Sequence, residues 1–237
     1  MKYRDLQERD DEKRGFEWFE DDLKVKSEKE NKKLNKIWSK MEIECSDILK
    51  VYRRYVKIQQ PTWVEDIEYL ERGARGTTSQ YYKGKARSNR KPRDISQGLQ
   101  DEIDNILREL KIPVLRSNSY FVSIVNAVYY GQRYQIFPLN GFKYLWFRNS
   151  TDLYNNLKKV IGRTNLFKNI EKVPEEKRRE KLKKIILDFE PVYNKGLWEI
   201  LKNRKSNEIM FTGSYYAIET YSPLHLFINN KMISHLK

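Results

Sequence analysis

The spacing of hydrophobic residues changes along the chain, and this change constrains the fold more than any other feature of the sequence. In residues 16–58, 94–110 and 152–201 the apolar residues recur at the three- and four-residue intervals of an amphipathic helix. Between residues 119 and 147 they form short aromatic and β-branched runs separated by turn residues, which is typical of strands. Helices segregated from short strands predict an α+β fold, with a helical N-terminal region at residues 1–58.

Six short segments have the composition of strands. The Asn140-Gly141 pair lies between two of them and predicts a tight hairpin turn, because both residue types accept the positive φ angles that such turns require. The six predicted strands are residues 119–125, 133–138, 142–147, 208–212, 215–219 and 224–228.

The composition permits a packed core and excludes several classes of protein. The chain has 237 residues, of which 39% are hydrophobic and 13% aromatic, and this is too apolar for a disordered protein. The mean hydropathy is −0.84 and no run of about 18 apolar residues is present, so neither a transmembrane helix nor a membrane partner is expected. The first residues, MKYRDLQERDDEKR, are charged and contain no apolar segment, so a secretory signal is not expected.

The few cysteines and histidines argue against a metal centre. Cys45 is the single cysteine and cannot form an internal disulfide. His225 and His235 are the two histidines, and both lie near the C-terminus. We therefore expect a protein of a reducing compartment whose chemistry uses no metal cofactor.

The chain carries 47 basic and 33 acidic residues, a net charge of +14, which favours nucleic acid or another anion as a partner. The densest basic stretch is KGKARSNRKPR at residues 83–93, where Gly and Pro predict a loop. Two interpretations are open: a loop that contacts phosphates, and a solvated connection. The candidate nucleic-acid contacts are Lys83, Lys85, Arg87, Arg90, Lys91 and Arg93.

Three short patterns remain as candidates for a functional site, since the phosphate-loop, GxGxxG, HExxH, CxxC and GxSxG motifs are all absent from the sequence. Residues 69–73 read YLERG and place an arginine beside a glycine. Residues 116–123 read RSNSYFVS, followed by Tyr130-Gly131. Residues 207–213 read NEIMFTG and place one carboxylate before an apolar strand.

In this order the three patterns resemble the arginine–serine–glutamate class of mono-ADP-ribosyltransferases. Residues 90–146 are also similar to uncharacterised phage-encoded proteins of this type. The resemblance covers residues 65–228. It implies an ADP-ribosyltransferase-like core of short strands in two small sheets within residues 59–237, with a helical insertion at about 152–205.

The resemblance implies NAD as co-substrate and assigns a role to each matched residue. The planar guanidinium of Arg72 would bind the NAD pyrophosphate, and Gly73 would let the backbone approach it. The Ser123 hydroxyl would orient the ribose or the glutamate. Glu208 would bind the ribose 2′-hydroxyl and oppose the positive charge that develops on the ribose. The aromatic candidates for stacking on nicotinamide are Tyr120, Phe121 and Tyr130.

The sequence departs from the family pattern at the residues after Ser123 and at the position that in the family helps to activate the acceptor. Ser123 is followed by Ile124-Val125, and Ser206 stands where the family's first glutamate of Glu-x-Glu would be. In the family this first acid helps to activate an acceptor such as an arginine, so its absence argues against an arginine acceptor. Hydroxyl, nucleobase and other acceptors stay open, as do NAD hydrolysis without an acceptor and an inactive site. The basic loop before Glu208 is the candidate target-recognition segment, with Lys202, Arg204, Lys205 and Ser206.

The leading prediction is a phage-encoded, NAD-dependent mono-ADP-ribosyltransferase that modifies a host protein or nucleic acid. It would act in the host-cell cytoplasm, either made there or carried in with the virion and its other proteins. The alternative is a non-catalytic, basic virion or nucleic-acid-binding protein that uses the same fold as a scaffold, because fold does not establish activity.

Overall fold

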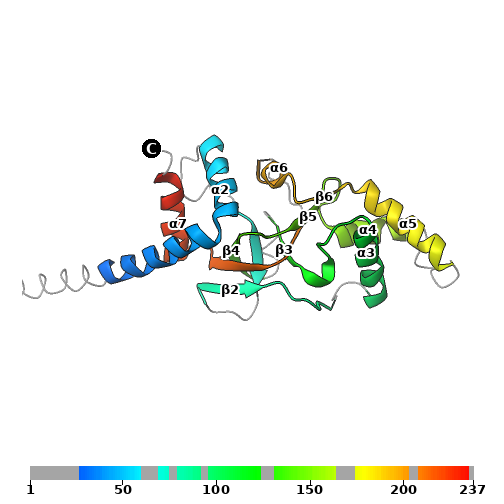
Figure 1. Ribbon diagram of the computed structural model, residues 1–237, viewed down its shortest axis with the longest axis horizontal. Helices are drawn as coiled ribbons and strands as arrows, with labels where there is room; N and C mark the ends of the chain where they lie inside the picture. Colours follow the sequence, from blue (N-terminus) through cyan, green and yellow to red (C-terminus); the bar gives the residue numbers. More distant parts are fainter. Residues whose placement is uncertain are drawn as a thin grey trace, which may run out of the picture. The chain divides into compact units, whose positions relative to one another are not determined.

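The computed structural model of the chain describes residues 27–59, 69–74, 79–91, 96–123, 131–163, 174–202 and 208–234. The chain forms two compact units, residues 1–43 and 44–237. The described part of the first unit is helical throughout, within a helix over residues 27–44 (Figure 1). Glu and Lys at i,i+4 spacing, such as Glu28 and Lys32, favour this helix. Residues 16–26 of the predicted helix lie outside the described part.

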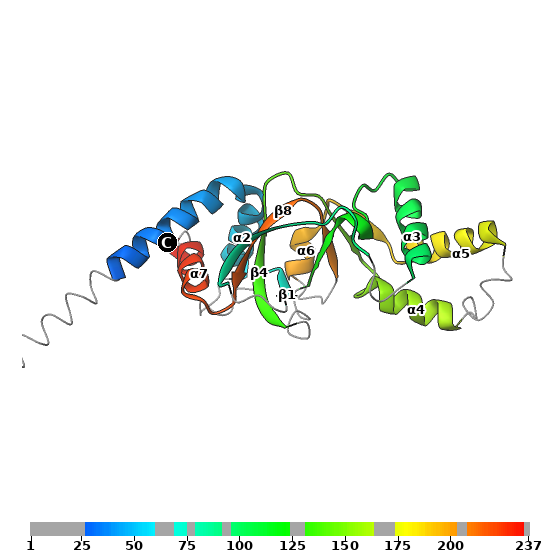
Figure 2. The ribbon, with the colours of Figure 1, turned by 90° about the horizontal axis from the view of Figure 1, so that it is seen from below.

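Two small antiparallel sheets form the centre of the second unit and confirm the α+β class (Figure 2). In the first sheet the strand order is β1-β4-β8-β2, and in the second it is β3-β7-β5-β6. The strands of the first sheet are β1 (Glu71–Ala74), β2 (Tyr81–Lys85), β4 (Gln132–Pro138) and β8 (Ser214–Glu219). Those of the second are β3 (Tyr120–Val122), β5 (Tyr144–Phe147), β6 (Pro191–Tyr193) and β7 (Ile209–Phe211).

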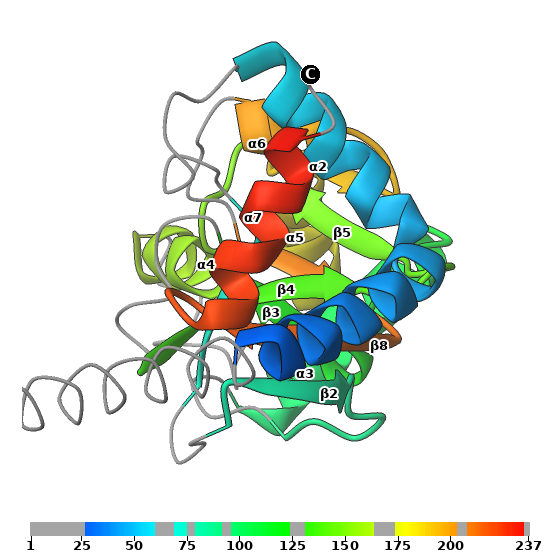
Figure 3. The same cartoon turned by 90° about the vertical axis from the view of Figure 1, so that its left-hand side faces the viewer.

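Each sheet has its own set of helices. Helices α2 (Ser46–Gln59) and α7 (Pro223–Ser234) contact each other and pack on β4 and β8 of the first sheet (Figure 3). Helix α2, which the sequence analysis groups with the N-terminal region, belongs to the second compact unit and also contacts α6 (Leu197–Lys202). Helices α3 (Gln97–Glu109), α4 (Leu153–Arg163) and α5 (Glu175–Asp188) share a hydrophobic core with β5 and β7 of the second sheet.

The predicted helix at 94–110 is confirmed by α3, and its start has a local cause. The side chain of Ser96 accepts a hydrogen bond from the backbone N–H of Leu99 at 3.3 Å and so caps the first turn. Ile103, Ile106 and Leu107 form the buried stripe expected from their spacing.

The predicted hairpin at Asn140-Gly141 is wrong, although a turn does form there with a φ of +77° at Gly141. The strands on either side enter different sheets, because β4 pairs with β1 and β8 whereas β5 pairs with β6 and β7. The turn is held instead by the start of α2. The Asn140 side-chain oxygen accepts from the N–H of Asp47 at 3.0 Å, and the Asp47 carboxylate accepts from the N–H of Gly141 at 3.2 Å.

The predicted strand at 224–228 is also wrong, because these residues lie in α7. The alternation of Leu224, Leu226 and Ile228 suggests a strand, but Leu226 is 40% exposed while Leu224 and Ile228 are buried. The helix begins after Ser222, whose hydroxyl accepts from the N–H of His225 at 3.3 Å, and Pro223 takes the first helical position. The Ser222-Pro223 pair is a typical helix start, which the sequence analysis missed because the alternation of apolar residues suggested a strand.

Two further elements correct the sequence analysis. The segment 152–205 is not wholly helical, because β6 lies within it and pairs with β5. The stretch 83–93 is not wholly a loop, because Lys83 and Lys85 belong to β2, which pairs with β8. The YYKGK of β2 contains two lysines and a glycine, and β6 begins with a proline, so neither strand has the hydrophobic pattern of a typical strand. The pairing partner determines their conformation.

A close approach between β2 and β8 depends on a glycine. Gly84 faces Tyr215 across the ladder, and a Cβ atom built on Gly84 would lie 2.4 Å from Cζ of the Tyr215 ring. The ring has little room to move, because its centroid lies 4.3 Å from that of Tyr120 and 6.4 Å from that of Tyr82. Gly84 therefore sets the position of Tyr215.

We expect Gly84→Ala to destabilise the protein by about 2 kcal/mol, because the added methyl group overlaps a buried ring. The matched control is Gly98→Ala on α3, where no atom lies within 4 Å of the built Cβ. This control should stabilise the fold by about 0.5 kcal/mol through the helix propensity of alanine. Urea unfolding of both variants measures the difference, and equal stabilities would contradict the packing argument.

Candidate functional site

The two sheets are joined at one point by backbone hydrogen bonds. Glu71 of β1 and Ser123, directly after β3, form an isolated antiparallel bridge. The N–H of Glu71 donates to the carbonyl of Ser123, and the N–H of Ser123 donates to the carbonyl of Glu71, both at 2.8 Å. The bridge places Arg72, the next residue of β1, at the junction of the sheets.

The same junction brings Glu208 beside Ser123. Strands β3 and β7 pair with Val122 opposite Ile209, and the next step of this register places Ser123 opposite Glu208. The N–H of Glu208 donates to the carbonyl of Thr151 at 2.7 Å, which fixes the residue before β7. Three residues taken from distant parts of the sequence therefore lie on adjacent strands.

The side chains of these three residues do not all share one face. Paired residues of an antiparallel bridge point to the same side, so Glu71, Ser123 and Glu208 share a face, and Arg72 points to the other. A terminal nitrogen of Arg72, Nη1, donates to the Tyr215 hydroxyl at 3.3 Å. Ser123 and Glu208 therefore share a face of adjacent strands, whereas the Arg72 guanidinium lies on the opposite face.

A different arginine accompanies Glu208. The guanidinium of Arg116 lies 3.8 Å from the Glu208 carboxylate, and the two side chains are 8% and 26% exposed. Burial raises the pKa of Glu208, the positive charges of Arg116 and Arg90 oppose that rise, and the negative charge of Asp152 adds to it. Sequence reasoning missed this pairing, although Arg116 begins the RSNSYFVS segment that it singled out.

The guanidiniums of Arg90 and Arg116 both lie over the ring of Phe121, a residue of β3. The Arg90 guanidinium is 4.0 Å and the Arg116 guanidinium 4.9 Å from the centroid of its ring, both within the range of cation–π attraction. The side chain is partly buried and packs on the core of the second sheet. The groups that stack on the Phe121 ring in this structure are therefore the two arginine side chains.

The other aromatic candidates differ in their placement. Tyr120 is 2% exposed, and its ring packs against those of Phe211 and Tyr215 at centroid distances of 5.7 and 4.3 Å. Because these neighbours already cover the ring, Tyr120 is a core residue and not a stacking platform, which corrects the expectation for it. Tyr130 lies outside the described residues. Gly73 lies on β1 opposite Arg133.

The predicted nucleic-acid residues do not form one loop surface. Lys83 donates to the Glu44 carboxylate at 3.2 Å and lies over the Tyr216 ring, so its charge is partly neutralised. Lys85, Arg87 and Lys91 are exposed, and Arg90 belongs to the Phe121 group. Of the predicted target-recognition residues, Lys202 ends α6 and is exposed. Arg93, Arg204, Lys205 and Ser206 lie outside the described residues.

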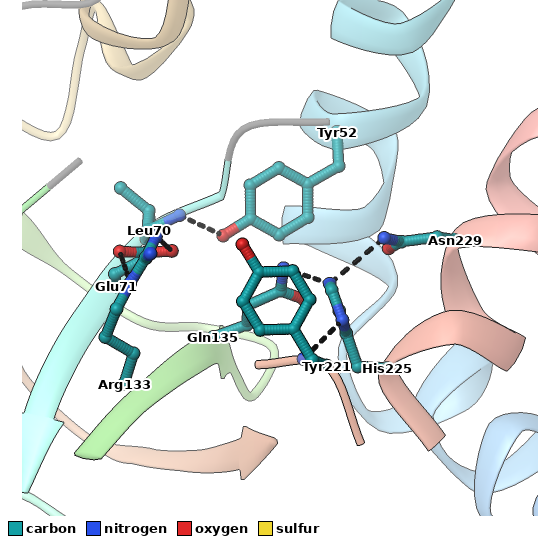
Figure 4. Close-up of polar contacts among 8 residues, drawn as sticks. All are labelled: Tyr52, Leu70, Glu71, Arg133, Gln135, Tyr221, His225 and Asn229. Carbon is teal, nitrogen blue, oxygen red and sulfur yellow. Dashed lines mark hydrogen bonds and ion pairs between the residues drawn. The ribbon is translucent and has the colours of Figure 1, made fainter. Parts of the chain in front are cut away.

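A second polar cluster surrounds Glu71 and the residues next to it and ties α2 and α7 to the first sheet (Figure 4). The buried Glu71 carboxylate accepts from Nε of Arg133 at 3.0 Å and from its Nη2 at 2.5 Å. The Tyr52 hydroxyl accepts from the N–H of Leu70 at 3.2 Å and donates to the carbonyl of Ile136 at 3.0 Å. This network holds β1, and with it the bridge to Ser123, against the rest of the unit.

His225 is the third part of this cluster and is 3% exposed. Its Nδ1 accepts from the N–H of Tyr221 at 2.9 Å. The amide ends of Gln135 and Asn229 lie 2.6 and 3.0 Å from Nε2 (Figure 4). Burial, with a smaller effect of the Arg133 charge, lowers the pKa of His225 from 6.5 to about 4. The ring is a neutral structural element at pH 7.

Among the described residues no helix is long and apolar enough to cross a bilayer, and no group of three or more His, Cys, Asp or Glu side chains is placed to hold a metal ion. Comparison of the chain with protein-family models, with curated proteins and with solved structures finds no match. The functional argument therefore depends on the geometry of the junction.

The low pKa of His225 predicts a pH-dependent stability. The unfolded chain takes up a proton at a pKa near 6.5 and the folded chain only near 4, so stability is full above pH 6.5 and falls as the pH drops toward 4. Between pH 7 and pH 5 this group should account for a loss of about 2 kcal/mol. Urea unfolding at both pH values should show a smaller loss for His225→Gln. An identical loss in the two proteins would contradict this assignment.

Proposed function

We propose that the chain is an NAD-dependent mono-ADP-ribosyltransferase with its site at the junction of the two sheets. The observation that carries the proposal is the position of Ser123 opposite Glu208, on the strand that bridges to the Arg-Gly strand β1. This is the neighbourhood that the resemblance to the arginine–serine–glutamate class leads one to expect. The two guanidiniums close to Glu208 add positive charge suited to a dinucleotide.

The proposed reaction needs a carboxylate and a hydroxyl, and the junction offers both. The bond between ribose C1′ and the nicotinamide nitrogen breaks, and nicotinamide leaves with the electron pair as a neutral molecule. The acceptor donates a lone pair to C1′ and releases its proton to solvent. The Glu208 carboxylate would oppose the positive charge that develops on the ribose, and Ser123 would hydrogen-bond beside it. Burial raises the pKa of Glu208, and the charges of Arg116 and Arg90 oppose this rise and so favour the ionised form that this role requires.

The acceptor under this proposal is a host protein or nucleic acid, with the enzyme acting in the host cytoplasm or delivered with the virion. Lys202 precedes Glu208 by a few residues and is exposed, in keeping with a basic target-recognition loop. Neutralising Lys202, Arg204 and Lys205 together should abolish labelling of an acidic acceptor and leave nicotinamide release in place. Unchanged acceptor labelling would exclude the loop from target recognition.

One observation favours the non-catalytic alternative, a basic protein that binds nucleic acid. Lys85, Arg87 and Lys91 are exposed on one short segment, and none of them makes an ion pair with an acid of the described ranges, as Lys83 does with Glu44. Such a segment would contact phosphates, and DNA affinity would then fall steeply with salt.

The decisive test is Glu208→Gln, which removes the carboxylate charge and keeps the shape of the side chain. The purified chain is incubated with adenylate-labelled NAD and a bacterial lysate, and label in protein, label in nucleic acid and free nicotinamide are measured. We expect the variant to lose activity by about 100-fold, since one preorganised electrostatic group is removed. The matched control is Glu109→Gln, at an exposed position of α3, which should retain full activity.

A wild-type chain that releases no nicotinamide and labels no acceptor would overturn the enzymatic proposal. In that case a steep salt dependence of DNA binding would support the alternative. Activity that persists in Glu208→Gln would show that the reaction does not use this carboxylate.

A further inference from the structure

Arg116 is a buried charged residue whose side chain has unpaired hydrogen-bond donors among the described residues. Its side chain is 8% exposed, and its Nε and Nη1 atoms have no hydrogen-bond acceptor among the described residues. A buried guanidinium is stable only when its donors meet acceptors of opposite charge, because burial removes the water that otherwise solvates it. An anion that reaches Arg116 would supply the acceptors that its guanidinium lacks.

The nearby carboxylates do not supply those acceptors. Asp104 is buried on α3, and its two oxygens accept from the backbone N–H groups of Arg116 and Ser117 at 2.8 and 3.2 Å. Glu208 lies 3.8 Å from Nη1 of Arg116, which is an ion pair without a hydrogen bond. Asp104 thus fixes the turn that carries Arg116, while the guanidinium keeps two unused donors.

Arg90 is held next to Arg116 by its backbone. Its N–H donates to the carbonyl of Ser117 at 2.9 Å, and its carbonyl accepts from the Gln100 side chain at 2.8 Å. Both guanidiniums lie near the Phe121 ring, at 4.0 and 4.9 Å from its centroid. Two planar cations are thus positioned together by hydrogen bonds and a ring, before any ligand is present.

We propose that Arg116 and Arg90 bind the diphosphate group of the dinucleotide, an inference that rests on the function proposed above. Phosphate oxygens are the charged acceptors that the buried donors of Arg116 lack among the described residues, and a planar guanidinium offers a phosphate an edge with two parallel donors. This assignment differs from the one that the resemblance implies, because Arg72 donates to Tyr215 on the opposite face.

The test measures binding of inorganic pyrophosphate and of ADP-ribose to the full chain by calorimetry at low ionic strength. We expect Arg116→Gln to weaken both by at least about 10-fold, since a charge-assisted bidentate contact is lost. Arg116→Lys keeps the charge but loses the fork and should be intermediate. Arg90→Gln should weaken binding less, and Arg108→Gln, an exposed arginine of α3, is the control for loss of one positive charge and should bind normally.

The outcomes separate this inference from the proposed function. Wild-type affinity in Arg116→Gln, or a loss confined to Arg72→Gln, overturns the diphosphate assignment even if Glu208-dependent labelling is observed. Pyrophosphate binding that depends on Arg116, in a chain that never releases nicotinamide, supports the anion site and overturns the enzymatic function. If Arg116→Gln fails to fold, Arg90→Gln decides, and wild-type affinity for pyrophosphate in that variant overturns the proposal.

Discussion

The pair of backbone hydrogen bonds between Glu71 and Ser123 is the contact on which the candidate site depends. It joins the edge strand β1 of one small sheet to the edge strand β3 of the other, and so closes two edges that would otherwise be open. The side chain of Glu71 also holds β1 in place, through its buried ion pair with Arg133. Because β3 also pairs with β7, the bridge aligns Ser123 with Glu208.

Strand geometry divides the arginines of the junction between two environments. On one side Arg72 faces the packed rings of Tyr82, Tyr120 and Tyr215, and its guanidinium donates to the Tyr215 hydroxyl. Arg116 and Arg90 face Phe121 and the Glu208 carboxylate on the other. A hydroxyl satisfies a guanidinium only weakly, and so does a carboxylate beyond hydrogen-bond distance. Nε and Nη1 of Arg116 therefore have no hydrogen-bond acceptor among the described residues.

Local signals sufficed where a helical periodicity is long or a strand is strongly aromatic. The spacing of Ile103, Ile106 and Leu107 identified α3, and the aromatic run before Phe147 identified β5. The same reasoning failed at Asn140-Gly141, where the turn joins two sheets, and at Leu224–Ile228, where capping by Ser222 overrides a short alternation. Periodicity over five residues does not distinguish a strand from a helix when burial is determined by partners far along the chain.

The amino-acid sequence by itself determined the α+β class, most helix and strand positions, and the presence of Ser123 and Glu208 at strand ends, because propensity and periodicity act over neighbouring residues. Only the tertiary structure decided that these two residues face each other, that Arg72 points away from them and that Arg116 replaces it beside the carboxylate. The reason is that pairing register and the face of a strand depend on contacts between segments about 50 to 140 residues apart, which no local pattern encodes.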